Sequence, residues 1–324
     1  MMYVYLAAGF MLLLGGAEVL VRGAVALAQR LDISPLIIGM TVVALGTSAP
    51  ELMVSLDAAL SGSPGIALGN VVGSNIANLF LILGTVGIVM PIAAKSDGLW
   101  RDGLILLAGS LLFVALCWSG MIGFWPGILL LAVFVAFLGH SYWRETKNDG
   151  GAEMRAQKVL EIHGVPSSVT VAWLFLTAGL ASVIFGAHLL VMGGVAIAKA
   201  AGVSEEVIGL TMIAFGTSLP ELATSVVAAW RGHAEIALGN VVGSNLFNML
   251  LIVGVVAVVT PLQVPAKIMV FDLWVMLAAT AVFLPFLACG WRFDRFVAVV
   301  FLAAYVAYIA VQAYDVQVIL PAAG

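Results

Sequence analysis

The chain of 324 residues has very little charge: Asp, Glu, Lys and Arg make up only 9% of it, whereas 63% of its residues are hydrophobic. Soluble globular domains carry about 25% charged residues, so this composition excludes an ordinary water-facing surface. No basic stripe is present, which argues against nucleic-acid binding. The chain also lacks an HExxH sequence and a nucleophile–base set, so an intramembrane enzyme is not favoured and we expect no enzymatic activity.

Cysteine is scarce as well. Cys117 and Cys289 both fall inside apolar segments, and they have neither metal-site spacing nor a partner for a disulfide framework. We expect them to be small buried or lipid-facing side chains. Nothing in the sequence implies a cofactor or an obligate protein partner.

What the chain does have is long apolar runs, each able to supply the roughly 20 residues that a helix needs to cross a bilayer. Lipid offers backbone groups no hydrogen-bond partners, so such spans must be helical. Ten spans are predicted, with the second, third, seventh and eighth interrupted: about 3–22, 33–60, 64–90, 99–118, 122–142, 168–198, 203–230, 234–260, 268–290 and 293–314. The predicted fold class is an all-α integral membrane protein with about ten transmembrane helices.

The first span is expected to be retained, because the first basic residue, Arg22, follows the apolar run instead of preceding it as in a signal peptide. Alternating the sides of the loops from an external N-terminus puts eleven Lys and Arg residues on one side and two, Lys199 and Lys267, on the other. The positive-inside rule then predicts a cell (inner or plasma) membrane protein with both termini outside. The loop 143–167 becomes a short cytoplasmic linker.

One segment of the sequence occurs twice, as an internal repeat. Residues 39–84 and 209–254 align without a gap at an offset of 170 and are identical at 27 of 46 positions. The same offset pairs three further glycines with glycines: Gly9 with Gly179, Gly16 with Gly186 and Gly23 with Gly193. We therefore predict two five-span halves, 1–142 and 168–324. Because five is odd, the second half is turned over in the membrane, which is the inverted-repeat plan of secondary transporters.

The first polar motif of each repeat puts carboxylates at membrane depth, where an ionised group is costly without a partner. It reads GTSAPE up to Glu51 and GTSLPE up to Glu221. Helical spacing places the two residues three and four positions earlier on the same face as each glutamate; these are Thr47 and Ser48 in the first copy, and Thr217 and Ser218 in the second.

Each of these motifs also contains a proline, Pro50 or Pro220, that cannot donate a backbone hydrogen bond. This predicts that carbonyl oxygens over 44–47 and 214–217 are released from helical bonds. Carboxylate, hydroxyl and carbonyl oxygens are the ligands that hard cations take. No histidine or thiol accompanies them, so zinc and copper are not favoured.

The second polar motif is GNVVGSN, which ends at Asn75 and Asn245 and is followed by Asn78 and Asn248. Ser74 lies one helical turn before Asn78, and Ser244 one turn before Asn248, so we favour these four as cation ligands. The Gly69–Gly73 spacing is typical of close helix packing. For the remaining asparagines of the motif, interhelical hydrogen bonding and ion contact stay open alternatives: Asn70, Asn75, Asn240 and Asn245.

Taken together, these motifs resemble the two α-repeats of the Ca²⁺/cation antiporter superfamily, specifically its Na⁺/Ca²⁺ exchanger branch. The resemblance implies an antiporter that exchanges Ca²⁺ for Na⁺ by alternating access, with Ca²⁺ export as the expected direction. It also implies one ion site built from both copies: the carbonyls of Ala44 and Ala214, and the side chains of Thr47, Ser48, Glu51, Ser74, Asn78, Thr217, Ser218, Glu221, Ser244 and Asn248.

The chain departs from some relatives, including potassium-dependent ones, which have Asp where it has Asn78 or Asn248; potassium co-transport is therefore less expected. An H⁺/Ca²⁺ antiporter is the alternative within the superfamily. A cation channel is the alternative of another class, although a pore gives no reason for paired deep glutamates. Three charged or titratable residues keep two interpretations each: a hydrogen-bonded or snorkelling role against a proton or gating role for Glu18 and His188, and an interfacial role against an ion-entry role for Asp57.

Overall fold

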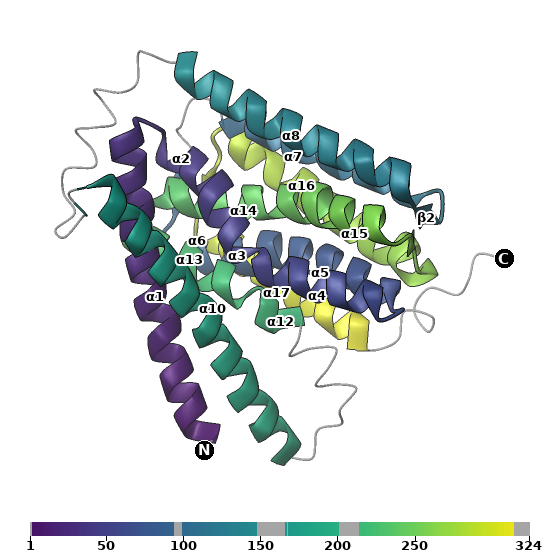
Figure 1. Ribbon diagram of the computed structural model, residues 1–324, viewed down its shortest axis with the longest axis horizontal. Coiled ribbons are helices and arrows are strands. Elements are labelled where there is room, and N and C mark those ends of the chain that lie inside the picture. The colour runs from purple at the N-terminus through teal and green to yellow at the C-terminus, as the bar shows by residue number, and fades with distance from the viewer. Residues whose placement is uncertain (1, 94–98, 148–165, 167, 201–213, 314–324) are drawn as a thin grey trace. The chain divides into compact units, whose positions relative to one another are not determined.

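The computed structural model describes residues 2–93, 99–147, 166, 168–200 and 214–313, and most of these residues are helical (Figure 1). The helices of the first half are α1 (Met2–Leu31), α2 (Pro35–Ile38), η1 (Gly39–Val43), α3 (Ala44–Thr47), α4 (Ala49–Leu60), α5 (Pro64–Ala77), η2 (Asn78–Ile82), α6 (Leu83–Val89), α7 (Leu99–Cys117) and α8 (Phe124–Lys147). Those of the second half are α10 (Val169–Ala200), α12 (Ala214–Thr217), α13 (Leu219–Trp230), α14 (Ala234–Leu246), η4 (Phe247–Ile252), α15 (Val253–Val259), η5 (Ile268–Asp272), α16 (Leu273–Ala288) and α17 (Arg295–Ala313). The labels η mark π-helical turns.

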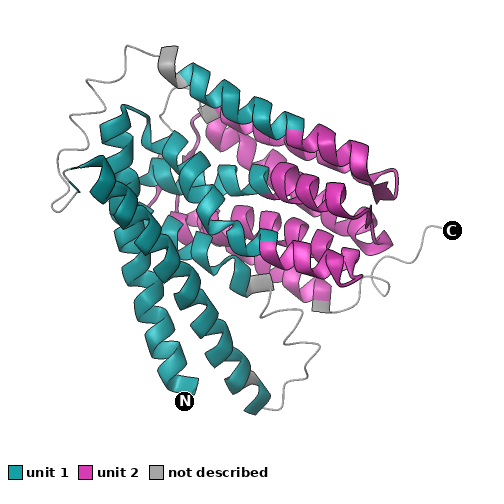
Figure 2. Cartoon of the chain, viewed as in Figure 1, with its two compact units in different colours: residues 1–52, 132–247 teal, residues 53–131, 248–324 magenta. Residues whose placement is uncertain are grey.

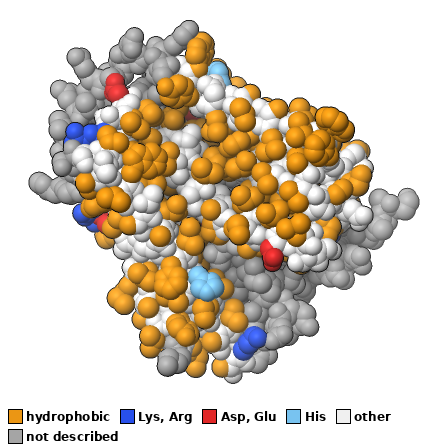
Figure 3. All heavy atoms as spheres, in the orientation of Figure 1, with side chains coloured by type: hydrophobic (Ala, Val, Ile, Leu, Met, Phe, Trp, Pro, Cys, Tyr) orange, Lys and Arg blue, Asp and Glu red, His pale blue; other side chains and the backbone are white. Residues whose placement is uncertain are grey.

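Among the described residues, eight helices are long and apolar enough to cross a membrane, and a bent pair, Pro35–Thr47 with Ala49–Leu60, makes a ninth candidate. The predicted span 203–230 begins at residues that lie outside the described ones, and its described part is α12 and α13. Hydrophobic side chains dominate the face seen in Figure 3, as expected for a surface that contacts lipid. The structure confirms the predicted all-α membrane protein.

The first span is longer than predicted. α1 continues past residue 22 to Leu31, so Arg22 lies inside the helix and not in a loop. The helix tolerates this charge because Arg22 pairs with Glu18 one turn earlier, at 2.8 Å. It ends where Asp32 adopts the left-handed conformation (φ 54°) and the Ile33 N–H closes back on the Ala28 carbonyl at 3.0 Å.

The predicted interruptions take two physical forms. In the second span the axis bends by 42° at the break between Thr47 and Ala49, just before Pro50. In the third and eighth spans the helix does not break but widens into π-helical turns, η2 beginning at Asn78 and η4 containing Asn248. Such bulges occur frequently at functional sites, and here they fall on two of the predicted ligands.

The chain forms two compact units: residues 1–52 with 132–247, and residues 53–131 with 248–324 (Figure 2). Each unit therefore takes helices from both predicted halves, and the halves themselves remain a prediction from the repeat. α8 extends to Lys147, five residues into the predicted linker. The rest of that linker, apart from residue 166, lies outside the described residues.

In the first unit, α1 and α10 pack against each other in an antiparallel manner through glycines that the 170-residue offset relates. A Cβ atom on Gly9 would lie 2.8 Å from the Gly186 carbonyl oxygen, and one on Gly179 would lie 2.8 Å from that of Gly16. No side chain larger than hydrogen fits at such a distance. The contact is thus made twice, once from each helix, as two inverted copies of one segment require.

The described residues of the second unit also pair the two halves of the sequence, through four short strands. β1 (Ile92–Ala93) pairs antiparallel with β4 (Arg292–Phe293), and β2 (Met121–Ile122) pairs antiparallel with β3 (Leu262–Gln263). Each pair joins one strand from either half of the sequence. The turns before β2 and β4 each contain a glycine at positive φ, 77° at Gly120 and 63° at Gly290, which are again 170 residues apart.

Of the two cysteines, Cys117 is buried and Cys289 is exposed on the second unit.

Candidate ion-binding site

The two predicted carboxylates of the first unit occupy equivalent places at the start of a helix. Glu51 lies in the first turn of α4, and Glu221 in the first turn of α13. The prolines immediately before them are tolerated there because an N–H group in the first turn of a helix has no acceptor within that helix. The positive end of each helix dipole therefore lies at the carboxylate, which stabilises its negative charge.

Both carboxylates are buried together with hydroxyls of the opposite copy. Glu51 and Glu221 are each only 1% exposed. The Ser48 hydroxyl donates to Glu221 Oε1 at 3.0 Å. In the other direction, the Thr217 hydroxyl hydrogen-bonds the Glu51 carboxylate, and the two carboxylates are near enough to repel each other. The structure thus brings the two GTSxPE motifs together, as the inverted repeat predicts.

Among the described residues of this unit, the buried side-chain oxygens without a hydrogen-bond partner include Glu221 Oε2 and Ser244 Oγ. Buried polar atoms in proteins nearly always have a partner, and an exception calls for an ion, a water or a functional role. An array of carboxylate and hydroxyl oxygens fits a hard cation as that partner. Within the residues that the structure describes, no group of three or more His, Cys, Asp or Glu residues is placed to hold a metal ion.

The predicted release of the Ala44 carbonyl is wrong. Its oxygen accepts the Ser48 N–H at 3.0 Å and lies 3.4 Å from the Thr47 hydroxyl. The reason is the spacing: Pro50 withdraws a donor from the residue four positions earlier, Gly46, whereas the partner of Ala44 is Ser48, which keeps its N–H. Ala44 can still bind a cation through the second lone pair of its oxygen. The Ala214 carbonyl stays a prediction.

Asn240 has a hydrogen-bonding role between helices. Its side-chain nitrogen donates to Ser225 Oγ at 3.0 Å, and its oxygen accepts the Thr47 hydroxyl at 3.2 Å. Asn70 repeats the first contact in the second unit, donating to Ser55 Oγ at 3.0 Å. The two serines were not predicted to matter. They sit 170 residues apart and are identical in the aligned repeats, which is the signal that could have found them.

The second unit holds the other predicted ligands, Ser74, Asn78 and Asn248, all 3% exposed or less. Asn248 donates from Nδ2 to Asn75 Oδ1 at 3.1 Å, while its own Oδ1 is buried with no partner among the described residues. Asn75 therefore forms a hydrogen bond between helices, which is one of the two roles left open for it. That these side chains share one site with the glutamates stays a prediction.

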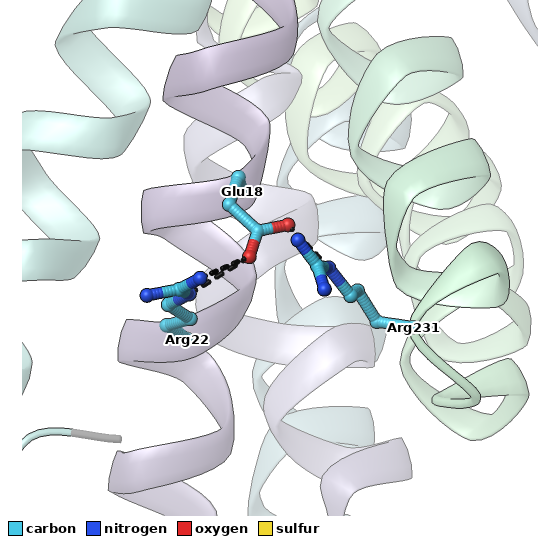
Figure 4. Close-up of polar contacts among 3 residues, drawn as sticks. All are labelled: Glu18, Arg22 and Arg231. Atoms are coloured by element: carbon cyan, nitrogen blue, oxygen red, sulfur yellow. Dashed lines mark hydrogen bonds and ion pairs between the residues drawn. The ribbon is translucent and has the colours of Figure 1, made fainter. Parts of the chain in front are cut away.

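Glu18 lies between two arginines (Figure 4). Its Oε1 pairs with Arg22 at 2.8 Å, and its Oε2 pairs with Arg231, just after α13, at 2.7 Å. The Glu18 side chain is 21% exposed, so the hydrogen-bonded role is the one that the structure shows. His188, its counterpart at the 170-residue offset, is exposed, as is Asp57.

A membrane-embedded helical fold with two buried, mutually repelling carboxylates defines a transporter of small cations and not an enzyme. A family model described as "Sodium/calcium exchanger protein" matches residues 1–143 and 171–314. The chain therefore belongs to this family, and the predicted resemblance is confirmed.

Individual relatives span nearly the whole chain. This chain is 38% identical over 309 residues to the "Putative antiporter CaxA" of Alkalimonas amylolytica, and the alignment covers 94% of this chain and 96% of CaxA. It is 31% identical over 344 residues to the "Sodium/calcium exchanger MaX1" of Methanosarcina acetivorans, covering 96% and 98%. A solved structure of the sodium-calcium exchanger NCX_Mj superimposes with a TM-score of 0.83 at 31% identity, over 96% of this chain and 99% of that one.

Proposed function

We propose that this protein is a secondary antiporter that exchanges Ca²⁺ for Na⁺ by alternating access, with Glu51 and Glu221 as its central ion ligands. The observation that carries the proposal is the burial of both carboxylates, each in hydrogen-bonding contact with a hydroxyl of the other repeat. Two similar proteins, MaX1 and NCX_Mj, are named as sodium/calcium exchangers, which supports Na⁺ and Ca²⁺ as the exchanged ions.

The charge of the site explains why a cation must be present. Two unit charges of like sign 4 Å apart at an effective dielectric constant of 20 repel by roughly 4 kcal/mol. One Ca²⁺ neutralises both glutamates, and monovalent cations shared among the surrounding oxygens do the same. If only the neutralised site passes through the closed state, the empty carrier cannot return, and this requirement makes the protein an exchanger and not a uniporter.

The hydroxyls of Thr47, Ser48, Thr217 and Ser218 supply neutral oxygens beside the carboxylates, and Asn240 holds Thr47 in place. Ser74, Asn78 and Asn248 of the second unit complete the proposed ligand set, together with Ser244 and the carbonyls of Ala44 and Ala214. Asn78 and Asn248 add no charge, so one Ca²⁺ balances the site. The proposed exchange needs no cofactor, exports Ca²⁺ from the cell, and takes place in a cell membrane with both termini outside.

The test is ⁴⁵Ca flux in proteoliposomes carrying the purified protein, with either a Na⁺ gradient or a pH gradient imposed. Na⁺-driven flux that persists when the pH is equal on both sides supports Na⁺/Ca²⁺ exchange. Flux that follows the pH gradient and ignores Na⁺ would replace it with H⁺/Ca²⁺ exchange. Flux that needs neither counter-ion would indicate a channel.

A further inference from the structure

We infer that Met276 and Asn75 are positioning residues that hold the amide of Asn248 with its oxygen, and not its nitrogen, free to bind the transported cation. The inference rests on the proposed function, in which Asn248 is a ligand, and it adds to that function the residues that make a neutral amide act as one. All three residues belong to the second unit, and each is 1% exposed.

The three side chains form one directed line of hydrogen bonds. Asn248 Nδ2 donates to Asn75 Oδ1 at 3.1 Å, and Asn75 Nδ2 donates to the Met276 sulfur at 3.6 Å. At the end of this line, Asn248 Oδ1 is buried without a partner among the described residues. The amide nitrogens of Asn248 and Asn75 thus both point toward Met276. The oxygen left without a partner, Oδ1, belongs to Asn248, the residue predicted to bind cations.

Met276 decides the direction of the line because a thioether sulfur accepts hydrogen bonds and cannot donate them. If the Asn75 amide were turned over, its nitrogen would meet the nitrogen of Asn248, and two donors would face each other. Asn248 would then have to turn over too, and its NH₂ group would be the end left open. Such a group repels a cation, so the turned-over pair would lack a ligand.

The same reasoning explains why an asparagine at position 248, and not an aspartate, needs positioning residues. The two oxygens of a carboxylate are equivalent, and neither carries a donor when it is ionised, so an aspartate at this position would need no such orientation. The 170-residue offset matches Met276 to Leu106, whose side chain has no acceptor. The methionine is therefore specific to one copy of the repeat, as a positioning role for Asn248 alone requires.

Met276→Leu is the matched perturbation, because it keeps the size and apolar character of the side chain and removes only the sulfur. One intramolecular hydrogen bond of net 0.5–1.5 kcal/mol corresponds to about a two- to tenfold change in an equilibrium constant. We expect the Ca²⁺ concentration for half-maximal ⁴⁵Ca uptake to rise by that factor, with the maximal rate and the unfolding temperature in detergent unchanged. Met249→Leu makes the same chemical change at an equally buried methionine beside Asn248 and should have no effect.

Repeating Met276→Leu in an Asn248→Asp variant separates the orientation of residue 248 from a simple effect on packing. There the orientation of residue 248 no longer matters, so Met276→Leu should change the half-maximal Ca²⁺ concentration by less than twofold. The inference is overturned if Met276→Leu raises the half-maximal Ca²⁺ concentration by the same factor in both backgrounds. It is also overturned if Met276→Leu leaves that concentration unchanged in the wild-type background. If the Asn248→Asp variant binds no Ca²⁺, the deciding measurement is Ca²⁺ binding by the single Asn75→Leu variant. This variant must weaken Ca²⁺ binding at least as much as Met276→Leu does, and a smaller effect overturns the inference.

These outcomes are separable from failure of the proposed function. Ca²⁺-dependent thermal stabilisation of the detergent-solubilised wild-type protein reports binding without transport. A wild-type protein that neither binds nor exchanges Ca²⁺ contradicts the proposed function itself. A wild-type protein that does both, while the methionine variants behave alike, contradicts only the role of Met276.

Discussion

Replacing Glu221 by glutamine tests the paired carboxylates with almost no change of shape. Ser48 can still donate to the remaining Oε1, at the 3.0 Å seen for Glu221, so the local hydrogen bond survives. What is lost is one negative charge. A unit charge 4 Å from another at an effective dielectric constant of 20 interacts by roughly 4 kcal/mol, and a divalent cation doubles that value.

Even if solvent and rearrangement offset half of this attraction, Ca²⁺ binding should weaken by about 4 kcal/mol, or roughly a thousandfold. The stability of the ion-free protein should change in the opposite direction. Removing the repulsion between Glu51 and Glu221 should leave the unfolding temperature equal or higher. Loss of transport together with retained stability would separate a binding defect from a folding defect.

The assay is ⁴⁵Ca uptake into Na⁺-loaded proteoliposomes, with thermal unfolding measured in detergent on the same preparations. Glu235→Gln is the matched control, because Glu235 also lies in the first turn of a helix, α14, but is exposed. We expect wild-type uptake from the control and none from Glu221→Gln at micromolar Ca²⁺. Uptake by Glu221→Gln at the wild-type level would refute the reasoning, and so would a loss of uptake that only accompanies a lower unfolding temperature.

Three further predictions concern topology, charge movement and the ion pairs of Glu18. Tags before Met1 and after Gly324 should be labelled from outside and a tag near Gly150 only from the cytoplasm; opposite labelling of the two termini would contradict an equal number of spans in the two halves. Exchange of three Na⁺ for one Ca²⁺ should respond to voltages set with valinomycin and K⁺, because one charge is worth about 2.3 kcal/mol per 100 mV, and voltage-independent flux would favour an electroneutral ratio. Arg231→Gln should change the maximal exchange rate about two- to fivefold without changing Ca²⁺ affinity, because it removes a partly exposed ion pair between α1 and the end of α13. Arg30→Gln at an exposed arginine is the control, and an equal effect of the two variants would exclude a specific role for Arg231.

Much of the fold could be predicted from the sequence because the bilayer limits the choices. A run of about 20 apolar residues must be a helix, so the approximate positions of most spans follow from hydropathy. The end of α1 could not be read in this way. Arg22 resembles a loop residue until its pairing with Glu18 is known, and the actual stop depends on the backbone conformation of Asp32.

The candidate site shows the same division between pattern and geometry. The spacing of GTSxPE placed Thr, Ser and Glu on one face, and the resemblance implied one ion site built from both copies. The contacts of Ser48 with Glu221 and of Thr217 with Glu51 are seen only in the structure. The spacing of Pro50 could have singled out the Gly46 carbonyl instead of the whole stretch 44–47, since Ser48, the partner of Ala44, keeps its N–H. The sequence could not predict the sulfur of Met276 as the acceptor for Asn75, since the two residues are 201 positions apart and lie in different halves.

The most direct measurement of the central claim is equilibrium binding of ⁴⁵Ca to the purified protein in detergent, without any transport step. The account predicts that the wild-type protein binds one Ca²⁺ per chain with both glutamates neutralised, that Na⁺ displaces it, and that the Glu51→Gln, Glu221→Gln double variant binds none. The double variant must keep the unfolding temperature of the wild type for the comparison to report on the site. Undiminished, Na⁺-sensitive binding of Ca²⁺ by the folded double variant would contradict the account.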